Sequence, residues 1–254
     1  MTNTDFNLLD PRRQTEKDLL YAERMEGYFG KSLGKNIDKL RNFPKFVPRQ
    51  ILAKFLSKCE IFQRVLPLHG HIIECGVHLG GGLMTYAQLS AIYEPVNYLR
   101  QIVGFDTFTG FPDLGPRDMG DNMHQAVKGG LAAHAEADIQ ECIELYDLIR
   151  PLGHLGRVQL VAGDAVKTIP EYVEKNKHLV VAMLILDFDL FEPTKVALEN
   201  FLPRMPKGSV LVFDELCDPA WPGETMAVLE TLGIRNLRIE RFPYTSQPSF
   251  AVLE

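Results

Sequence analysis

Cysteine is scarce in this chain, and its pattern argues against two common kinds of stabilised domain. The 254 residues include four cysteines, which are widely spaced and form no C-x-x-C pair. Such cysteines are typical of reduced thiols in a cytosolic protein, not of a disulfide framework or a zinc site. A chain of this length buries most of its apolar surface without disulfide bonds.

Long apolar runs are also lacking. No stretch of the sequence reaches the ~18 apolar residues that indicate a membrane-spanning helix. The first residues, MTNTDFNLLDPRRQTEKD, have neither the basic start nor the apolar block of a signal peptide. We therefore expect a cytoplasmic protein without a membrane partner.

Basic residues do not predominate either. The chain has 27 Lys and Arg against 33 Asp and Glu, which gives a formal net charge of −6. A nucleic-acid-binding surface needs an excess of basic residues to neutralise phosphates, so we expect no nucleic-acid partner. With 46% apolar and 24% charged residues, the composition is that of a soluble protein with one large α/β domain or two small ones.

The order of the apolar segments predicts an α/β fold. Residues 13–65 have the periodicity of amphipathic helices, and from residue 70 short β-rich runs alternate with helical stretches such as 193–205 and 223–233. The first five β-rich runs are continuously apolar, as expected for parallel strands covered on both faces, and the last two are joined by a connection too short for a helix. We predict a Rossmann-like, doubly wound seven-stranded sheet whose last strand is antiparallel, with an N-terminal helical cap. The expected strands are 71–76, 101–106, 157–163, 180–187, 209–215, 236–242 and 249–254.

One segment fits neither a helix nor a strand. Residues 112–135 are rich in Gly, Asp and His and have weak periodicity. A loop of about 20 residues inside a compact domain is usually a functional lid or disordered. We interpret this segment as a lid insertion that covers a substrate.

A glycine-rich turn, IIECGVHLGGG, follows the first expected strand. Gly76 and Gly80 let the backbone turn tightly and approach a ligand at the start of the next helix. The spacing E-x-G-x-x-x-G-G differs from the G-x-G-x-x-G pattern that binds a dinucleotide pyrophosphate. Glu74 is an anion where a dinucleotide would bring phosphates, so it suits a ligand with a positive end, such as an amino group. A strand-to-helix turn without a ligand is the simpler alternative.

Acids also follow the second and third expected strands. Asp106, in GFDTFTGFP, stands where an acid accepts hydrogen bonds from ribose hydroxyls, and Phe108 could cover the ligand. Asp164 and Ala165 follow the third strand, where they could meet an adenine edge. Taken alone, an Asp after a strand is just as compatible with a helix cap.

Two aspartates end the fourth expected strand in LILDFDLFEP, and FDE ends the fifth. Because the ends of neighbouring parallel strands meet at one edge of a sheet, we expect Asp187, Asp214 and Glu215 to gather there. Carboxylates so close raise one another's pKa unless a cation neutralises them, and hard oxygen ligands suit Mg²⁺, Mn²⁺ or Ca²⁺ better than Zn²⁺. In extended backbone Asp189 points the same way as Asp187, so it could take a proton from a substrate hydroxyl. Helix caps and surface ion pairs are the simpler alternative, which we favour for Glu192 in the first turn of the next helix.

Taken together, ECGVHLGGG, GFDTFTGFP, AGDA, LDFDLFEPTKVALENFLPRMPKGSVLVFDE and WPGE resemble the class I S-adenosylmethionine-dependent methyltransferases. More narrowly they are similar to the macrocin and mycinamicin type sugar O-methyltransferases, which act on deoxysugars of antibiotics, and to the calicheamicin-type deoxysugar methyltransferases. The resemblance covers residues 20–233 and implies S-adenosylmethionine as the methyl donor. The cofactor-binding residues it implies are Glu74, Gly76 and Gly80 at the methionine part, Asp106 at the ribose with the adjoining Thr107 and Phe108, and Asp164 and Ala165 at the adenine.

The same resemblance implies a metal site and a base. Asp187, Asp214 and Glu215 match the family's metal ligands and Asp189 its general base, although the family more often has Asp-Asp where this chain has Asp214-Glu215. Residues 1–66 would form a helical cap that also mediates homo-oligomerisation, and residues 67–254 the methyltransferase domain. The implied reaction is methyl transfer to a hydroxyl of a deoxysugar in natural-product biosynthesis, with the sugar either nucleotide-linked or part of an antibiotic glycoside.

Three alternatives stay open at this point. A catechol-type O-methyltransferase uses a similar metal at the same sheet edge, but its metal motif usually ends in Asp-Asn, which this chain lacks. The second is a metal-binding protein of this fold that transfers no methyl group. The third is a non-catalytic domain that binds a nucleoside and serves as an assembly partner. A nicotinamide dehydrogenase is disfavoured by the glycine spacing and by the acid cluster.

Overall fold

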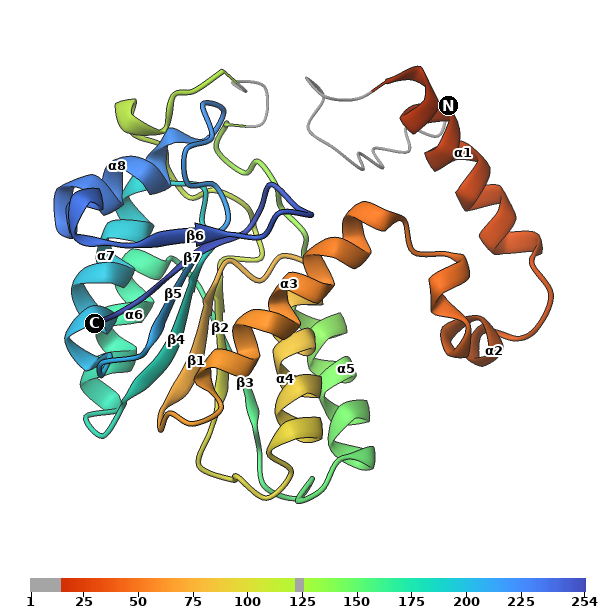
Figure 1. The fold of residues 1–254 in the computed structure, drawn as a ribbon, viewed down its shortest axis with the longest axis horizontal. Coiled ribbons are helices and arrows are strands. Elements are labelled where there is room, and N and C mark those ends of the chain that lie inside the picture. Colours follow the sequence, from red (N-terminus) through yellow and green to blue (C-terminus); the bar gives the residue numbers. More distant parts are fainter. Residues whose placement is uncertain (1–14, 122–125) are drawn as a thin grey trace. The chain divides into compact units, whose positions relative to one another are not determined.

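Seven strands form one mixed sheet in the computed structural model, which describes residues 15–121 and 126–254 (Figure 1). They are β1 (His71–Cys75), β2 (Ile102–Asp106), β3 (Val158–Ala162), β4 (Val181–Leu186), β5 (Val210–Phe213), β6 (Ile239–Arg241) and β7 (Ser249–Val252). The strand order is β3-β2-β1-β4-β5-β7-β6, and β1 to β5 run parallel. Because β7 pairs antiparallel with both β5 and β6, the predicted fold with an antiparallel last strand is confirmed.

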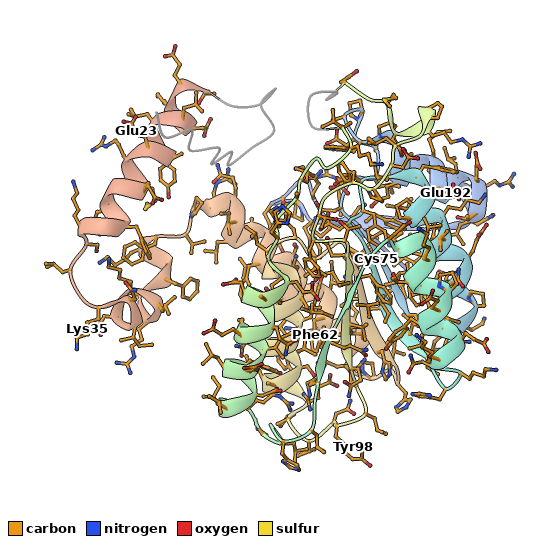
Figure 2. The ribbon with its side chains drawn as sticks, turned by 180° about the vertical axis from the view of Figure 1, so that it is seen from behind. Glu23, Lys35, Phe62, Cys75, Tyr98 and Glu192 are labelled. Atoms are coloured by element: carbon orange, nitrogen blue, oxygen red, sulfur yellow. The ribbon has the colours of Figure 1, made fainter. Side chains whose placement is uncertain are left out.

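Helices cover both faces of this sheet. They are α3 (Arg49–Val65), α4 (Gly81–Tyr93), α5 (Glu136–Ile149), α6 (Ala165–Lys175), α7 (Phe191–Phe201) and α8 (Pro222–Thr231). Successive residues of a strand point to opposite faces, so Ile72 packs with the second half of α3, α4 and α5, while Ile73 packs with α6, α7 and α8. Phe62 of α3 and Cys75 of β1, both fully buried, belong to these two opposite clusters (Figure 2). The doubly wound arrangement follows from this alternation.

Strand β3 departs from the predicted pattern of burial. Its residues Gln159 and Ala162 are exposed, whereas β4 and β5 are buried at every residue. The prediction that the first five strands are covered on both faces was therefore wrong for β3. The physical reason is its place at the end of the strand order, where one side of the strand has no neighbouring strand.

The two helices beside the predicted acid cluster begin close to their expected positions. α7 starts at Phe191, two residues before the predicted start, and Glu192 is exposed in its first turn as expected (Figure 2). Pro222 occupies the first position of α8, where its missing N–H costs no hydrogen bond. Gly233 follows α8 with a φ of 70°. Over the described ranges of the chain, no helix is long and apolar enough to cross a membrane.

The chain divides into two compact units, Met1–Leu56 and Ser57–Glu254. In the described part of the first unit, α1 (Glu16–Lys31), α2 (Asn36–Arg41) and the 3-10 helix η2 (Phe43–Lys45) precede α3. The Thr15 hydroxyl and backbone N–H both donate to Asp18, at 2.6 and 2.9 Å, which fixes the start of α1. The predicted helical character is thus confirmed from residue 16 on, and the preceding residues lie outside the described part. The cap and oligomerisation roles of residues 1–66 stay predictions.

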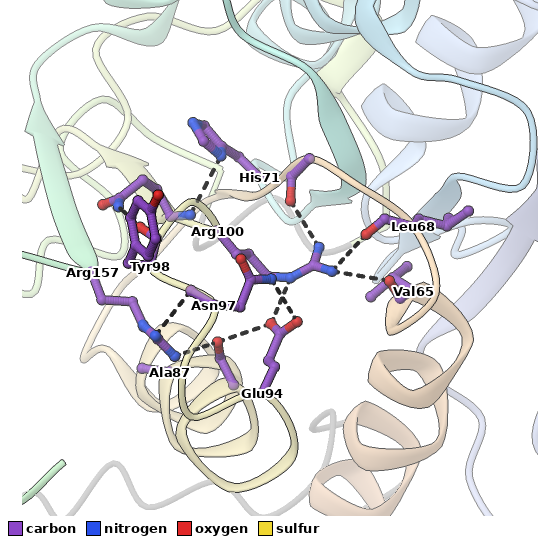
Figure 3. A network of polar contacts seen from close by, with 12 residues as sticks. Val65, Leu68, His71, Ala87, Glu94, Asn97, Tyr98, Arg100 and Arg157 are labelled. Carbon is purple, nitrogen blue, oxygen red and sulfur yellow. Dashed lines mark hydrogen bonds and ion pairs between the residues drawn. The ribbon is translucent and has the colours of Figure 1, made fainter. Parts of the chain in front are cut away.

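A buried pair of arginines fastens the edge of the sheet at which β1 and β2 begin (Figure 3). The Arg100 guanidinium donates to three carbonyls before β1, those of Val65, Leu68 and Gly70, at 2.8 to 3.1 Å. Its Nε lies 2.5 Å from Glu94 Oε1. Arg157 donates to the Ser90 hydroxyl at 2.9 Å and to the Asn97 carbonyl at 3.0 Å. These bonds satisfy two charges that would otherwise be costly to bury, and they stiffen the end of the sheet remote from the acids.

The predicted lid insertion is mostly irregular. Its described parts, 112–121 and 126–135, contain the 3-10 helix η3 (Pro116–Asp118). Residues 122–125 of the insertion lie outside the described residues. Its role in covering a substrate stays a prediction.

Candidate active site

Three carboxylates gather where β4 and β5 end. Asp187 and Asp214 extend the two strands by one residue each, since their backbone N–H groups donate to the carbonyls of Cys75 at 2.8 Å and Leu186 at 3.1 Å. Asp187, Asp214 and Glu215 each offer an oxygen, and these oxygens all lie within 4.8 Å of one another. The convergence predicted from the sequence is present in the structure.

The environment of Glu215 is unfavourable for a negative charge. The side chain is 6% exposed, and burial together with the charges of Asp214, Asp189 and Asp187 raises its pKa well above the usual range. Within the described residues its Oε2 has no hydrogen-bond partner. A buried, unsatisfied oxygen among like charges is stabilised by a cation, and three carboxylates form the hard donor set that suits a divalent ion such as Mg²⁺. The residues therefore fit the metal.

Asp189 lies close to this cluster but in an unexpected conformation. Its φ is +62°, in the left-handed region, so the prediction that extended backbone aligns it with Asp187 was wrong. The reason is that β4 ends at Leu186 and the chain must turn before α7 begins at Phe191. The Asp189 charge still raises the pKa of Glu215, so the carboxylate of Asp189 lies near the cluster. A non-glycine residue with left-handed backbone costs roughly 1–2 kcal/mol, and such strain is concentrated at functional sites.

A fourth carboxylate, Glu224, was not anticipated as a site residue. It is fully buried in the first turn of α8, and neither of its oxygens has a hydrogen-bond partner of good geometry in the described part of the chain. Burial and then the charge of Asp214 raise its pKa well above the usual range, while the nearby backbone amides of Glu215 and Asp214 lower it. In the sequence WPGE, an acid at the start of a helix is most simply explained by the helix dipole, so no local signal separates Glu224 from Glu192.

The glycine turn after β1 is built by close backbone contact. Gly76 has a φ of +95°, and a Cβ at this position would lie 1.8 Å from the carbonyl oxygen of Asp187. At Gly82, a Cβ would lie 1.9 Å from Glu74 Oε1. Gly80, with a φ of +83°, is the N-cap of α4. Close packing against Asp187 and Glu74 therefore requires glycine at positions 76 and 82.

Glu74 lies beneath this turn. The side chain is 1% exposed, and burial raises its pKa to about 7, against the lowering effect of the Lys58 charge. Its Oε2 has no hydrogen-bond partner among the residues that the structure describes. The predicted contact of Glu74 with a positively charged group of a ligand stays a prediction; in the structure the side chain is buried and packs against Gly82 of the turn.

Asp106 ties two loops together at the end of β2. Its Oδ2 accepts hydrogen bonds from the backbone N–H groups of Val77 at 2.7 Å and His78 at 2.8 Å, and its Oδ1 accepts one from Phe108 at 2.7 Å. A carboxylate has about four acceptor positions, so one remains for a ligand hydroxyl. The Thr107 hydroxyl donates to Gly110 at 2.7 Å. Phe108 is 3% exposed and belongs to the hydrophobic cluster, so its predicted role in covering a ligand stays a prediction.

Asp164 is the N-cap of α6. It accepts a hydrogen bond from the Val166 N–H at 3.1 Å and forms an ion pair with Lys167 at 3.5 Å. Ala165 is buried at the first position of the helix. The simpler interpretation, a helix cap, therefore describes Asp164, and an adenine contact would be additional. β2 and β3 are adjacent, and the Gly163 N–H donates to the Asp106 carbonyl at 2.9 Å, so the two acids share one edge.

The seven-stranded sheet, the glycine turn and the acid cluster define the class: a Rossmann-like methyltransferase. Residues 52–230 match the family described as Macrocin-O-methyltransferase (TylF), and the chain belongs to that family. The crystal structure of CalS11, a calicheamicin methyltransferase, is 34% identical, covers 96% of each chain and superposes with a TM-score of 0.90. An apo structure of CalS11, described as a TDP-rhamnose 3'-O-methyltransferase of calicheamicin biosynthesis, is 33% identical over 96% of this chain and 99% of that one, with a TM-score of 0.82.

A more distant relative is the demethyldecarbamoylnovobiocin O-methyltransferase of Streptomyces niveus. It is 24% identical over 154 residues, which are 59% of this chain and 55% of that relative. The chain thus spans about half the length of this curated relative. The structure of the O-methyltransferase NovP, 20% identical with a TM-score of 0.62 over 79% of each chain, shares the fold.

Proposed function

We propose that this methyltransferase uses a divalent metal ion to transfer the methyl group of S-adenosylmethionine to a hydroxyl of a nucleotide-linked deoxysugar. The observation that carries the proposal is the contact between Gly76 and Asp187, whose backbones leave no room for a side chain. It brings the turn that would hold the methyl donor against the backbone of Asp187, one of the three residues that would hold the metal. Donor and acceptor then meet at a single sheet edge.

The cofactor residues follow the strand ends. Gly76 and Gly80 would present backbone to the methionine part, and Glu74 would balance the ammonium charge from beneath the turn. Asp106 has one acceptor position left for a ribose hydroxyl, with Thr107 and Phe108 shaping its loop. The proposed adenine contacts are Asp164 and Ala165. Bound S-adenosylmethionine supplies an electrophilic methyl group on a sulfonium.

The metal residues would be Asp187, Asp214 and Glu215, with Mg²⁺ favoured over Mn²⁺ or Ca²⁺. A divalent cation held there would supply Lewis acidity toward a sugar hydroxyl. The chain's own contribution is orientation: Asp189 takes the proton of that hydroxyl, and the glycine turn aligns the methyl group for in-line attack.

The acceptor is proposed from the relatives. CalS11, described as acting on TDP-rhamnose, matches this chain over nearly its whole length, and the macrocin family and the novobiocin enzyme both belong to antibiotic biosynthesis. The description of CalS11 supports a nucleotide-linked deoxysugar over a finished glycoside. We also propose a cytoplasmic homo-oligomer without a nucleic-acid partner. The oligomer is supported by the exposure of Leu19 and Leu20 on α1, a helix that buries no side chain among the described residues.

An acceptor panel tests the proposal. The protein is incubated with methyl-labelled S-adenosylmethionine and Mg²⁺ against nucleotide-linked deoxysugars, antibiotic glycosides and vicinal phenols. We expect label in a nucleotide-linked deoxysugar. Label in phenols alone would support the catechol-type alternative instead, and a protein that binds the cofactor but labels no hydroxylated compound would support the non-catalytic alternative.

A further inference from the structure

The stretch 111–121, which we call the anchor segment, is fastened to the loop before α8. The Asp121 N–H donates to the Pro219 carbonyl at 3.0 Å, and the Phe111 ring lies 5.7 Å from the ring of Trp221. The anchor segment therefore contacts the loop that connects the metal-binding end of β5 to α8. Trp221 is the single tryptophan of the chain, which makes this contact observable.

Asp118 carries the closest contact between the anchor segment and α7. Its side chain is 3% exposed; Oδ1 accepts a hydrogen bond from the Phe191 N–H at 2.6 Å, and Oδ2 accepts one from the Gly115 N–H at 2.7 Å. Phe191 is the first residue of α7, and its N–H has no partner within the helix. The N-cap residue, Leu190, has no side-chain acceptor. The carboxylate of Asp118, 73 positions earlier in the sequence, thus caps the start of α7.

Gly223 closes the same contact from α8. A Cβ at this position would lie 2.5 Å from the Phe191 nitrogen, 2.6 Å from Asp118 Oδ1 and 2.7 Å from the Asp189 carbonyl oxygen. The Asp118 carboxylate, the turn that carries Asp189 and the start of α8 therefore meet without room for a methyl group. A shift in any one of them moves the other two.

Arg117 strengthens the contact from the outside. Its guanidinium lies 4.2 Å from the Phe191 ring and pairs with Glu230 of α8 at 2.9 Å. This pair is substantially exposed, so its contribution is small compared with the buried hydrogen bonds of Asp118. Both residues hold the start of α7: Asp118 binds the backbone N–H of Phe191, and Arg117 contacts the ring of Phe191.

We propose that Asp118 is a positioning residue for methyl transfer. By fixing the Phe191 N–H, it holds the turn between β4 and α7 and keeps Asp189 in its left-handed conformation near the carboxylate cluster. Asp118 does not touch the reacting atoms and acts only through Asp189. The inference rests on the proposed function in one respect, that Asp189 is the base.

Kinetics of two substitutions test this role. Asp118→Ala removes both hydrogen bonds, and we expect kcat to fall by about 10²-fold, the typical effect of a misplacement of about 1 Å, with KM for S-adenosylmethionine within twofold of wild type. Asp118→Asn keeps one acceptor oxygen and should fall between wild type and Asp118→Ala. The control is Tyr146→Phe, which removes a buried hydrogen bond of 2.7 Å to Ala87 on the other face of the sheet and should leave kcat unchanged.

Two further readouts separate this role from a general loss of stability and from failure of the proposed function. If Asp118 acts through Asp189, adding Asp118→Ala to Asp189→Asn should lower kcat by less than twofold more. Independently of any acceptor, Asp118→Ala should shift Trp221 emission to the red and increase its quenching by acrylamide, which Asp189→Asn should not do. A kcat for Asp118→Ala equal to that of Tyr146→Phe, or Trp221 emission and quenching identical to wild type, would overturn the inference. Absence of methyl transfer by wild type would instead contradict the proposed function, and the fluorescence result would still decide whether Asp118 holds the anchor segment.

Discussion

The backbone of Gly76 lies against the carbonyl of Asp187 so closely that a Cβ on residue 76 would stand 1.8 Å from the Asp187 oxygen. Gly76 begins the turn after β1, and Asp187 is the first residue after β4, the strand beside β1. This contact joins the two halves of the proposed site. Several properties of the protein should therefore respond to changes at either residue.

Gly76→Ala should damage both folding and cofactor binding. The added Cβ has no space, and the φ of +95° is strained for a residue with a side chain, so we expect a loss of at least about 2 kcal/mol in the free energy of unfolding. Affinity for S-adenosylmethionine, measured by calorimetry, should fall more than tenfold. Gly156→Ala is the matched control, because nothing lies within 4 Å of its added Cβ. Normal cofactor affinity in Gly76→Ala would show that this turn does not hold the cofactor.

Asp189→Asn should abolish most of the catalytic rate without affecting binding. Loss of a general base typically lowers the rate by 10²–10⁴-fold, and the amide preserves the shape of the side chain. Calorimetry should give cofactor affinity within twofold of wild type. Glu192→Gln, an equal change on the exposed first turn of α7, should keep the wild-type rate. A wild-type rate in Asp189→Asn would remove Asp189 from the mechanism.

Metal binding should appear as thermal stabilisation. Mg²⁺ at 100 times its Kd adds about 2.7 kcal/mol to the free energy of unfolding, which a thermal melt detects as a rise in Tm. Asp214→Asn removes one of the three converging carboxylates and should abolish this rise. Glu171→Gln removes the same charge from an exposed position of α6 and should retain it. An equal rise in Tm for Asp214→Asn and wild type would place the cation elsewhere.

Glu74 should make stability depend on pH in a defined direction. Its pKa is 4.5 as an ordinary value and about 7 in the folded protein, so between these values the folded state binds more protons than the unfolded chain. The free energy of unfolding must then decrease as pH rises from 4.5 to 7, by an amount on the order of 3 kcal/mol. Denaturant unfolding at several pH values should show a smaller decrease in Glu74→Gln. Curves for the two proteins that stay parallel from pH 4.5 to 8 would contradict this origin.

The strand ends were predictable from the sequence because parallel pairing leaves little freedom. Continuous apolar runs identify β4 and β5, and the residues that follow two neighbouring parallel strands must meet at one edge. Asp187, Asp214 and Glu215 therefore followed from the pattern alone. The conformation of Asp189 did not, because it depends on where the chain leaves the strand and on what holds the start of α7.

Contacts between distant segments account for what the sequence did not reveal. Asp118 reaches Phe191 across 73 residues, and no local pattern in an irregular, polar stretch marks it as a helix cap. Glu224 resembles an ordinary first-turn acid until the fold buries it beside Asp214. In both cases the side chain has a common local explanation, and its surroundings come from another part of the chain.

The most direct test of the central claim is methyl transfer to a nucleotide-linked deoxysugar, measured with labelled S-adenosylmethionine before and after removal of divalent cations with EDTA. We predict that EDTA abolishes the transfer, that excess Mg²⁺ restores it in wild type, and that excess Mg²⁺ does not restore it in Asp214→Asn. Transfer at an undiminished rate in EDTA would contradict the account, because the carboxylates beside Gly76 would then have no metal to hold.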